Sequence, residues 1–150
     1  MALGPRASQP QDDPTAPIVQ RAWSAWIAYI DEKGLFPKGT PSTPAVPFER
    51  PGTARPAIYE IARVKVGKGD REVLYLGKAI GPSEGVRRRL GDHYTIADPL
   101  YERIVEALLK RYVFVARFLQ LNLGEVPETE RLERELRDRL QSTRYPWNPR

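Results

Sequence analysis

From Ala57 onward, apolar and polar positions follow a pattern that predicts a small mixed fold. Residues 57–66 (AIYEIARVKV) and 71–77 (REVLYLG) alternate and are rich in β-branched and aromatic residues, which is typical of strands. The GKGD segment between them is a short turn, so the two strands are expected to form a hairpin. Residues 113–121 (VFVARFLQL) predict a third strand.

Helical spacing separates and follows these strands. A helix is predicted over 82–94, where Pro82-Ser83 gives a start signal, and another over 99–112, with apolar residues three or four apart. Residues 127–145 predict a final helix whose inner stripe is Leu132, Leu136 and Leu140. The order β-β-α-α-β-α predicts an α+β domain: a small three-stranded, mostly antiparallel sheet flanked by helices.

The first 56 residues have a different composition, with ten of the 15 prolines. Residues 1–17 predict a disordered tail, and 36–56 a proline-rich linker or a strap along the domain that spans 57–150. Apolar residues three or four apart predict an amphipathic helix over 18–35 that ends at Gly34. Trp23 and Trp26 share one face of that helix, which docks on its own domain or binds a partner protein.

Composition excludes several kinds of site. The 150 residues contain no cysteine and one histidine, so no disulfide, thiolate metal site or two-histidine site is possible. Metal binding would depend on carboxylates and water, which suits a hard ion such as magnesium. The formal charge of +5 weakly favours a polyanionic partner. Because no transmembrane run or secretory signal is present, we expect a cytoplasmic protein with no membrane partner.

Two tyrosines are the first candidates for chemistry. Tyr59 and Tyr75 fall on the two strands of the predicted hairpin, roughly across from each other, so their side chains can share one face. Tyrosines also pack well in strands, and this is the common reason for finding one there. A nearby cation that lowered a phenol pKa would let one tyrosine accept a proton from water.

A basic run in the next predicted helix contains the lone histidine. Arg89 and His93 are four residues apart and share a helix face, which suits a phosphate held by a forked arginine contact and a neighbouring imidazole. Arg87 and Arg88 point sideways, as phosphate-backbone contacts would, or form an ordinary solvated basic face.

Two further residues are candidates near the C-terminus. Glu133 flanks the leucine stripe of the last predicted helix, where one carboxylate can serve a magnesium ion, or can pair with Arg137 along the helix. Asn148 follows a proline and a tryptophan and fits either a site or an ordinary turn.

Taken in order, these residues resemble the GIY-YIG nuclease family over about residues 57–150. The matching elements are Ala57-Ile58-Tyr59, Tyr75-Leu76-Gly77 with Lys78 after it, Arg89 and His93 four apart, Leu132-Glu133, and Trp147-Asn148. The chain departs from the family pattern at Ala57, which replaces a glycine, and at Leu76, which replaces an isoleucine.

The resemblance implies a magnesium- or manganese-dependent endonuclease that hydrolyses DNA phosphodiesters with one metal ion. It implies Tyr59 as general base, Tyr75 and Lys78 as positioning groups for water and phosphate, and Arg89 as the phosphate clamp. It further implies that His93 holds the phosphate or assists, that Glu133 binds the metal, with Glu130 and Glu135 as alternatives, and that Asn148 fixes the end of the pocket.

Two other functions stay open for this sequence. The domain can be a nucleic-acid-binding module of the same fold that lost cleavage, or a scaffold that binds a partner through the Trp23/Trp26 helix. In the nuclease and in the binding module, the nucleic acid is contacted by Lys78, Arg87 and Arg88. The resemblance implies DNA, and RNA stays open.

Overall fold

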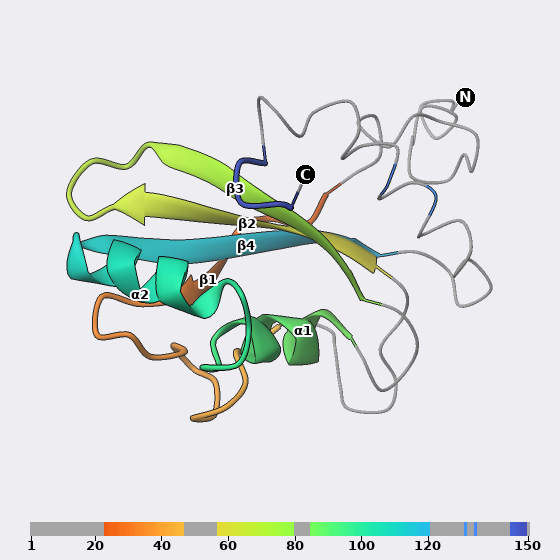
Figure 1. The fold of residues 1–150 in the computed structure, drawn as a ribbon, viewed down its shortest axis with the longest axis horizontal. Helices are drawn as coiled ribbons and strands as arrows, with labels where there is room; N and C mark the ends of the chain where they lie inside the picture. Colours follow the sequence, from red (N-terminus) through yellow and green to blue (C-terminus); the bar gives the residue numbers. More distant parts are fainter. Residues whose placement is uncertain are drawn as a thin grey trace, which may run out of the picture.

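The computed structural model describes residues 23–46, 57–79, 85–120 and 145–149, together with Arg131 and Arg134. Four strands and two helices form these parts of the chain (Figure 1). They are β1 (Ile27–Ile30), β2 (Ala57–Lys65), β3 (Arg71–Ala79), α1 (Val86–His93), α2 (Tyr101–Leu109) and β4 (Tyr112–Gln120). The strands form one antiparallel sheet in the order β1-β4-β2-β3, so the mixed α+β class predicted from sequence is confirmed.

Strands β2 and β3 form the predicted hairpin. Their pairing runs from Ala57 opposite Ala79 to Val64 opposite Arg71. In the turn, Gly67 and Gly69 have φ angles of 85° and 90°, in the left-handed region where a side chain is unfavourable. A register shift after Ile61 adds one residue to β3, which increases the local twist of the hairpin.

The sheet has four strands rather than the predicted three, because β1 pairs with β4. The helix expected over 18–35 is therefore wrong for its described part, residues 23–35. A register shift between Ala28 and Ile30 lets both Tyr29 and Ile30 enter the core, so the apolar residues do not alternate as in a regular strand. Backbone pairing to β4 outweighed the helical spacing.

Trp23 and Trp26 lie against their own domain. The guanidinium carbon of Arg117 lies 4.6 Å from the Trp23 ring centroid and 4.8 Å from that of Trp26. Arg117 also donates to Glu60 over 2.8 Å, and the Tyr145 hydroxyl donates to the second oxygen of Glu60. Of the two hypotheses for these tryptophans, docking on the parent domain agrees with the contacts, whereas the helix that a partner would bind is absent from 23–35.

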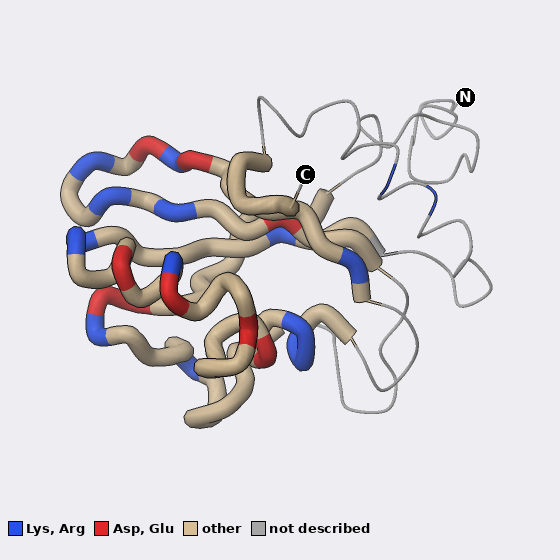
Figure 2. The backbone as a smooth tube through the Cα atoms, viewed as in Figure 1, with Lys and Arg blue, Asp and Glu red and all other residues tan. Residues whose placement is uncertain are grey.

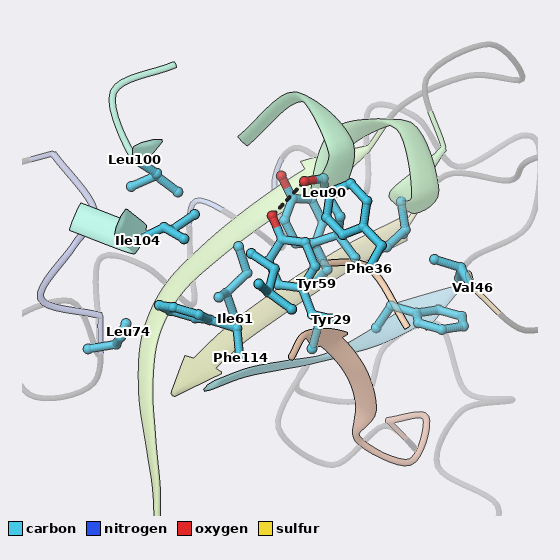
Figure 3. Close-up of a cluster of buried hydrophobic side chains, with 14 of the residues drawn as sticks. Tyr29, Phe36, Val46, Tyr59, Ile61, Leu74, Leu90, Leu100, Ile104 and Phe114 are labelled. Atoms are coloured by element: carbon cyan, nitrogen blue, oxygen red, sulfur yellow. Dashed lines mark hydrogen bonds between the residues drawn. The ribbon is translucent and has the colours of Figure 1, made fainter. Parts of the chain in front are cut away.

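Each face of the sheet has its own apolar cluster. The larger cluster lies between the sheet and the two helices, and Figure 3 shows Tyr59, Ile61 and Phe114 there with Leu90 of α1 and Ile104 of α2. The Tyr29 hydroxyl donates to the Leu90 carbonyl over 2.5 Å. We call this side the helix face. The smaller cluster, on the opposite face, contains Ile58, Leu76, Leu119 and Tyr145.

The other predicted elements agree with the structure within a few residues. Helix α1 begins later than expected, α2 is shorter, and β4 is the predicted third strand. Part of the proline-rich segment is described: Phe36 stacks on Tyr29 with 6.0 Å between ring centroids, and Val46 is also buried. The final helix lies outside the described residues except for Arg131 and Arg134, which are helical, and Tyr145, which is not. None of the described helices is long and apolar enough to cross a membrane.

Candidate active site

The structure brings Tyr59 and Tyr75 together on the helix face. Tyr59 lies across from Gly77, and Tyr75 lies across from Ile61, so the two tyrosines are diagonal neighbours rather than direct partners. Their ring centroids are 6.3 Å apart. The Tyr59 ring occupies the space above Gly77, where a side chain would collide with it. The two side chains share a face because the bulge in β3 places Tyr75 across from Ile61; without the bulge, the register from the turn would place it across from Glu60, on the opposite face.

His93, the last residue of α1, connects Tyr59 to a carboxylate. Its Nε2 atom lies 2.6 Å from the Tyr59 hydroxyl, and its Nδ1 atom lies 3.2 Å from each oxygen of Asp98. An ionised carboxylate only accepts, so Nδ1 carries the proton and Nε2 accepts from the phenol. The Tyr75 ring meets the imidazole edge-on at 5.1 Å. The arrangement is a hydrogen-bonded chain from phenol to imidazole to carboxylate.

Burial sets the ionisation of this chain. Desolvation raises the pKa of Tyr59 well above its ordinary value of 10, while the charge and hydrogen bond of Arg89 act in the opposite direction. Desolvation also lowers the pKa of His93 below its ordinary 6.5, opposed by Asp98. At neutral pH the pair is therefore a neutral phenol that donates to a neutral imidazole.

Arg89 is the arginine of the basic run that joins the cluster. Its guanidinium interacts with the Tyr59 hydroxyl and lies 3.6 Å from an oxygen of Asp92. The side chain is 33% exposed, so part of it is accessible to solvent. Arg88 is exposed and Arg87 is half-exposed. The Arg89 guanidinium thus interacts with the phenol that His93 also contacts.

The cluster has a buried inner part and a partly exposed outer part. Tyr59 is 0% exposed and His93 is 2% exposed. Tyr75 and Arg89 are intermediate. In this state a solvent-borne substrate meets Tyr75 and Arg89 first, and Tyr59 lies behind them.

Lys78 lies on the other side of the sheet from this cluster. It is directly across from Ile58, whose side chain belongs to the cluster on the opposite face. Residues directly across from each other in antiparallel strands share a face. The structure therefore does not bring Lys78 to Tyr59 and His93.

Asn148 holds the backbone of β3. Its Nδ2 atom donates to the Leu76 carbonyl over 2.9 Å, and its Oδ1 atom accepts from the Leu76 amide over 2.8 Å. The Trp147 amide adds a bond to the Leu74 carbonyl at 2.9 Å. β3 is an edge strand, so these bonds satisfy backbone groups that have no partner strand. Asn148 positions the strand that carries Tyr75 and does not contact the tyrosine cluster through any of these bonds.

The described residues do not form a metal site by themselves. Glu133, with its alternatives Glu130 and Glu135, lies outside them. Within the described ranges, no group of three or more His, Asp or Glu side chains converges on one point. Asp98 already accepts from His93 and from the Leu100 amide, which lies 2.9 Å from its Oδ1 atom. We therefore derive no step through a metal ion from these residues.

Asp98 is the functional candidate that sequence reasoning missed. It follows the lone histidine by five residues and precedes Pro99, a pair that is typical of a turn. Its Oδ1 atom accepts from the amide two residues on, as in an Asx turn, and this fixes the carboxylate beside His93. The sequence signal that could have identified Asp98 as a partner of His93 is its place in a turn shortly after the only histidine.

Comparisons with known proteins give no relationship for this chain. No protein-family model, no curated protein and no solved structure matches it.

Proposed function

We propose that this protein is a metal-dependent endonuclease of the GIY-YIG type that hydrolyses phosphodiester bonds in DNA. The observation that carries the proposal is the hydrogen-bonded chain from Tyr59 through His93 to Asp98, with Arg89 at its solvent-facing end. Proton transfer and phosphate neutralisation are the two tasks that phosphodiester hydrolysis sets for side chains. The order of the motif residues along the chain supports the same proposal.

Arg89 and Tyr75 contact the substrate in this mechanism. The partly exposed Arg89 side chain binds a non-bridging phosphate oxygen and stabilises the charge that develops on the phosphorane. Tyr75, at the partly exposed edge of the cluster, orients the attacking water. Arg87 and Arg88 extend the basic face of α1 along the neighbouring phosphates.

Tyr59 and His93 move the proton. Tyr59 accepts a proton from the water while it gives its own to Nε2 of His93, and Asp98 stabilises the imidazolium that forms. This coupled transfer avoids a free tyrosinate, which burial makes unfavourable. It requires that the Tyr59 oxygen becomes accessible when the phosphodiester binds, because the side chain has no exposed surface in this state.

The remaining roles have different support. Glu133 as the ligand of magnesium or manganese is proposed on the resemblance alone, and the bound ion would stabilise the leaving oxygen. Asn148 supports β3 from its edge. Lys78 contacts nucleic acid only if the strand passes around the end of the sheet, because it faces away from the tyrosines.

The test is a cleavage assay on labelled single-stranded, duplex, flap and branched DNA and on RNA, with magnesium and with chelator. Wild type is compared with Tyr59→Phe, Arg89→Lys and Glu133→Gln, and Tyr101→Phe is the matched control outside the cluster. Metal-dependent cutting that Tyr59→Phe, Arg89→Lys and Glu133→Gln lose and Tyr101→Phe keeps supports the proposal. No cutting of any substrate by wild type would overturn it.

The burial of Tyr59 and His93 favours one alternative function. A hydrogen-bonded pair with both members buried is also typical of a structural core network, and such a domain would bind nucleic acid without cutting it. Under that alternative, wild type and Tyr59→Phe bind DNA with the same affinity in the presence of metal, and neither cleaves it.

A further inference from the structure

A second concentration of positive charge lies at the far end of the β2–β3 hairpin from the tyrosine cluster (Figure 2). We call it the hairpin tip. Its basic residues come from the hairpin and from the corner that leads into β4: Arg63, Lys65, Lys68, Arg71, Lys110 and Arg111.

Backbone and side-chain bonds join the two loops of the hairpin tip into one surface. The Val66 amide donates to the Arg111 carbonyl over 2.8 Å, and Lys65 Nζ donates to the Lys110 carbonyl over 2.5 Å. The Tyr112 ring holds two of the cations beside each other, with Arg63 at 4.2 Å and Lys65 at 4.8 Å from its centroid. The Arg63 and Lys65 side chains therefore have a defined arrangement.

Most of this charge faces solvent without neutralisation. Lys68, Arg71, Lys110 and Arg111 are exposed. Within the described ranges, Arg63 is the one member that forms a salt bridge, with Glu72 at 2.8 Å. Within the segments that form the tip, residues 63–72 and 106–111, six basic side chains accompany three acidic ones, Asp70, Glu72 and Glu106. The surface has a clear positive excess.

The backbone at Arg111 is unusual. Its φ angle is 69°, in the left-handed region that favours glycine after a helix. An arginine at this position is held against its local preference and presents a cation next to Lys110. Glycine would suit the backbone better and would remove the charge, which makes Arg111→Gly a variant that separates binding from folding.

We propose that the hairpin tip binds the phosphate backbone of duplex DNA at a fixed distance from the scissile phosphate. The proposal extends the proposed function to the geometry of its substrate. Tyr59 and Lys65 are six residues apart on β2, which spans about 20 Å at the rise of a strand. One strand of B-DNA advances about 3.4 Å per nucleotide, so about six base pairs separate the two contacts.

A regular polyanion fits this surface better than the alternatives. Helix α1 packs near one end of the β2–β3 hairpin, and the hairpin tip is its other end. A stiff duplex can therefore contact the two basic regions at once. An anionic membrane is the competing partner, because Leu109 beside Lys110 is 81% exposed. Vesicles of phosphatidylserine therefore belong in the test.

Fluorescence anisotropy in the presence of chelator measures binding without cleavage. Wild type, Arg111→Gly and Lys68→Gln/Arg111→Gly are titrated with duplexes that extend 4 or 12 base pairs beyond a central nick that marks the site, over a range of salt. Lys38→Gln, an exposed lysine of the segment after β1, is the matched control. Affinity falls as salt rises, and each lost phosphate contact should make the slope of log affinity against log salt less negative by about 0.9. We expect this change on the long duplex only.

Three outcomes would overturn the proposal: no duplex binding by wild type, an equal slope for wild type and the double variant, or an equal loss on short and long duplexes. Vesicle binding that falls in the double variant while duplex binding does not would also overturn it, in favour of the membrane. Failure of the proposed function gives a different result. If wild type does not cleave but the double variant still has a reduced salt slope, the hairpin tip remains a DNA contact. An unfolding midpoint of Arg111→Gly at or above that of wild type shows that the variant is folded.

Discussion

Gly77 lies directly across from Tyr59 on the neighbouring strand, and a Cβ atom at Gly77 would lie 2.3 Å from the Cζ atom of the Tyr59 ring. The hydroxyl end of the ring therefore occupies the space above Gly77, where only a residue without a side chain leaves room. This contact directs the Tyr59 hydroxyl toward His93. Gly77 of the Tyr75-Leu76-Gly77 motif is thus required by the position of Tyr59.

The Gly77→Ala variant should be destabilised because the new methyl group and the fully buried Tyr59 ring cannot occupy the same space. Overpacking of this kind costs about 1–3 kcal/mol of the free energy of unfolding, which denaturant titration measures. The double variant with Tyr59→Leu should recover part of this loss, because the shorter side chain leaves the space free. An equal loss in both backgrounds would contradict the proposed contact.

Protonation of His93 should control stability near pH 6. The protein has one histidine, and burial lowers its pKa in the folded state below the ordinary 6.5 of the unfolded chain. Below pH 6.5 the unfolded state therefore binds the proton more readily, and the free energy of unfolding falls until the pH reaches the folded pKa. Urea titrations between pH 5 and pH 7.5 should show this decline for wild type.

Two variants show whether the decline belongs to His93. It should be weaker for His93→Gln, which has no proton to gain in this range. It should be steeper for Asp98→Asn, because loss of the carboxylate lets the pKa of His93 fall further. A decline that is unchanged in His93→Gln would assign it to other groups.

The Asp98→Asn variant should also slow cleavage under the proposed function. The neutral amide no longer stabilises the imidazolium that forms when Tyr59 passes its proton to His93, so the rate constant should fall about a hundredfold while KM changes little. Single-turnover cleavage at several pH values measures this. Glu102→Gln, an exposed change at the start of α2, is the control. A fall in affinity with an unchanged rate constant would indicate that Asp98 only supports the fold.

Strong local signals explain why most of the fold could be predicted. The hairpin alternates, has two glycines in its turn and pairs with a nearby strand, so its residues contain most of the information about its structure. β1 could not be predicted in this way. It has four residues, contains a register shift, and is a strand only because β4 offers a free edge that lies about 85 positions later in the chain.

The site was predictable to the extent that it depends on spacing along one element. Arg89 and His93 both contact Tyr59, because they are four residues apart on one helix and therefore share a face. The alignment of Tyr59 with Tyr75 depends on the bulge in β3, which displaces Tyr75 from the position that counting from the turn gives it. Asp98 was missed because its role depends on the path of the loop after α1. Lys78 was placed in the site by its position in a motif, although strand alternation puts it on the opposite face.

Asn148 gives the clearest difference between the role that the resemblance implies and the role that the geometry supports. The side chain is 4% exposed and makes two hydrogen bonds to the backbone of Leu76. In Asn148→Ala both backbone groups lose their partner at the edge of the sheet. Unsatisfied groups of this kind cost about 1–3 kcal/mol, so the unfolding midpoint should fall clearly.

Cleavage should respond differently to the same change. Because Asn148 acts through β3, the folded fraction of Asn148→Ala should keep a rate constant within a few-fold of wild type, and hydrogen exchange at the Leu76 amide should become faster. Arg103→Ala is a control for general loosening of residues 145–149. It removes an exposed side chain whose Cζ atom lies 5.9 Å from the ring centroid of Trp147, the residue before Asn148. A large loss of rate with an unchanged unfolding midpoint and unchanged exchange at Leu76 would instead place Asn148 in the reaction itself.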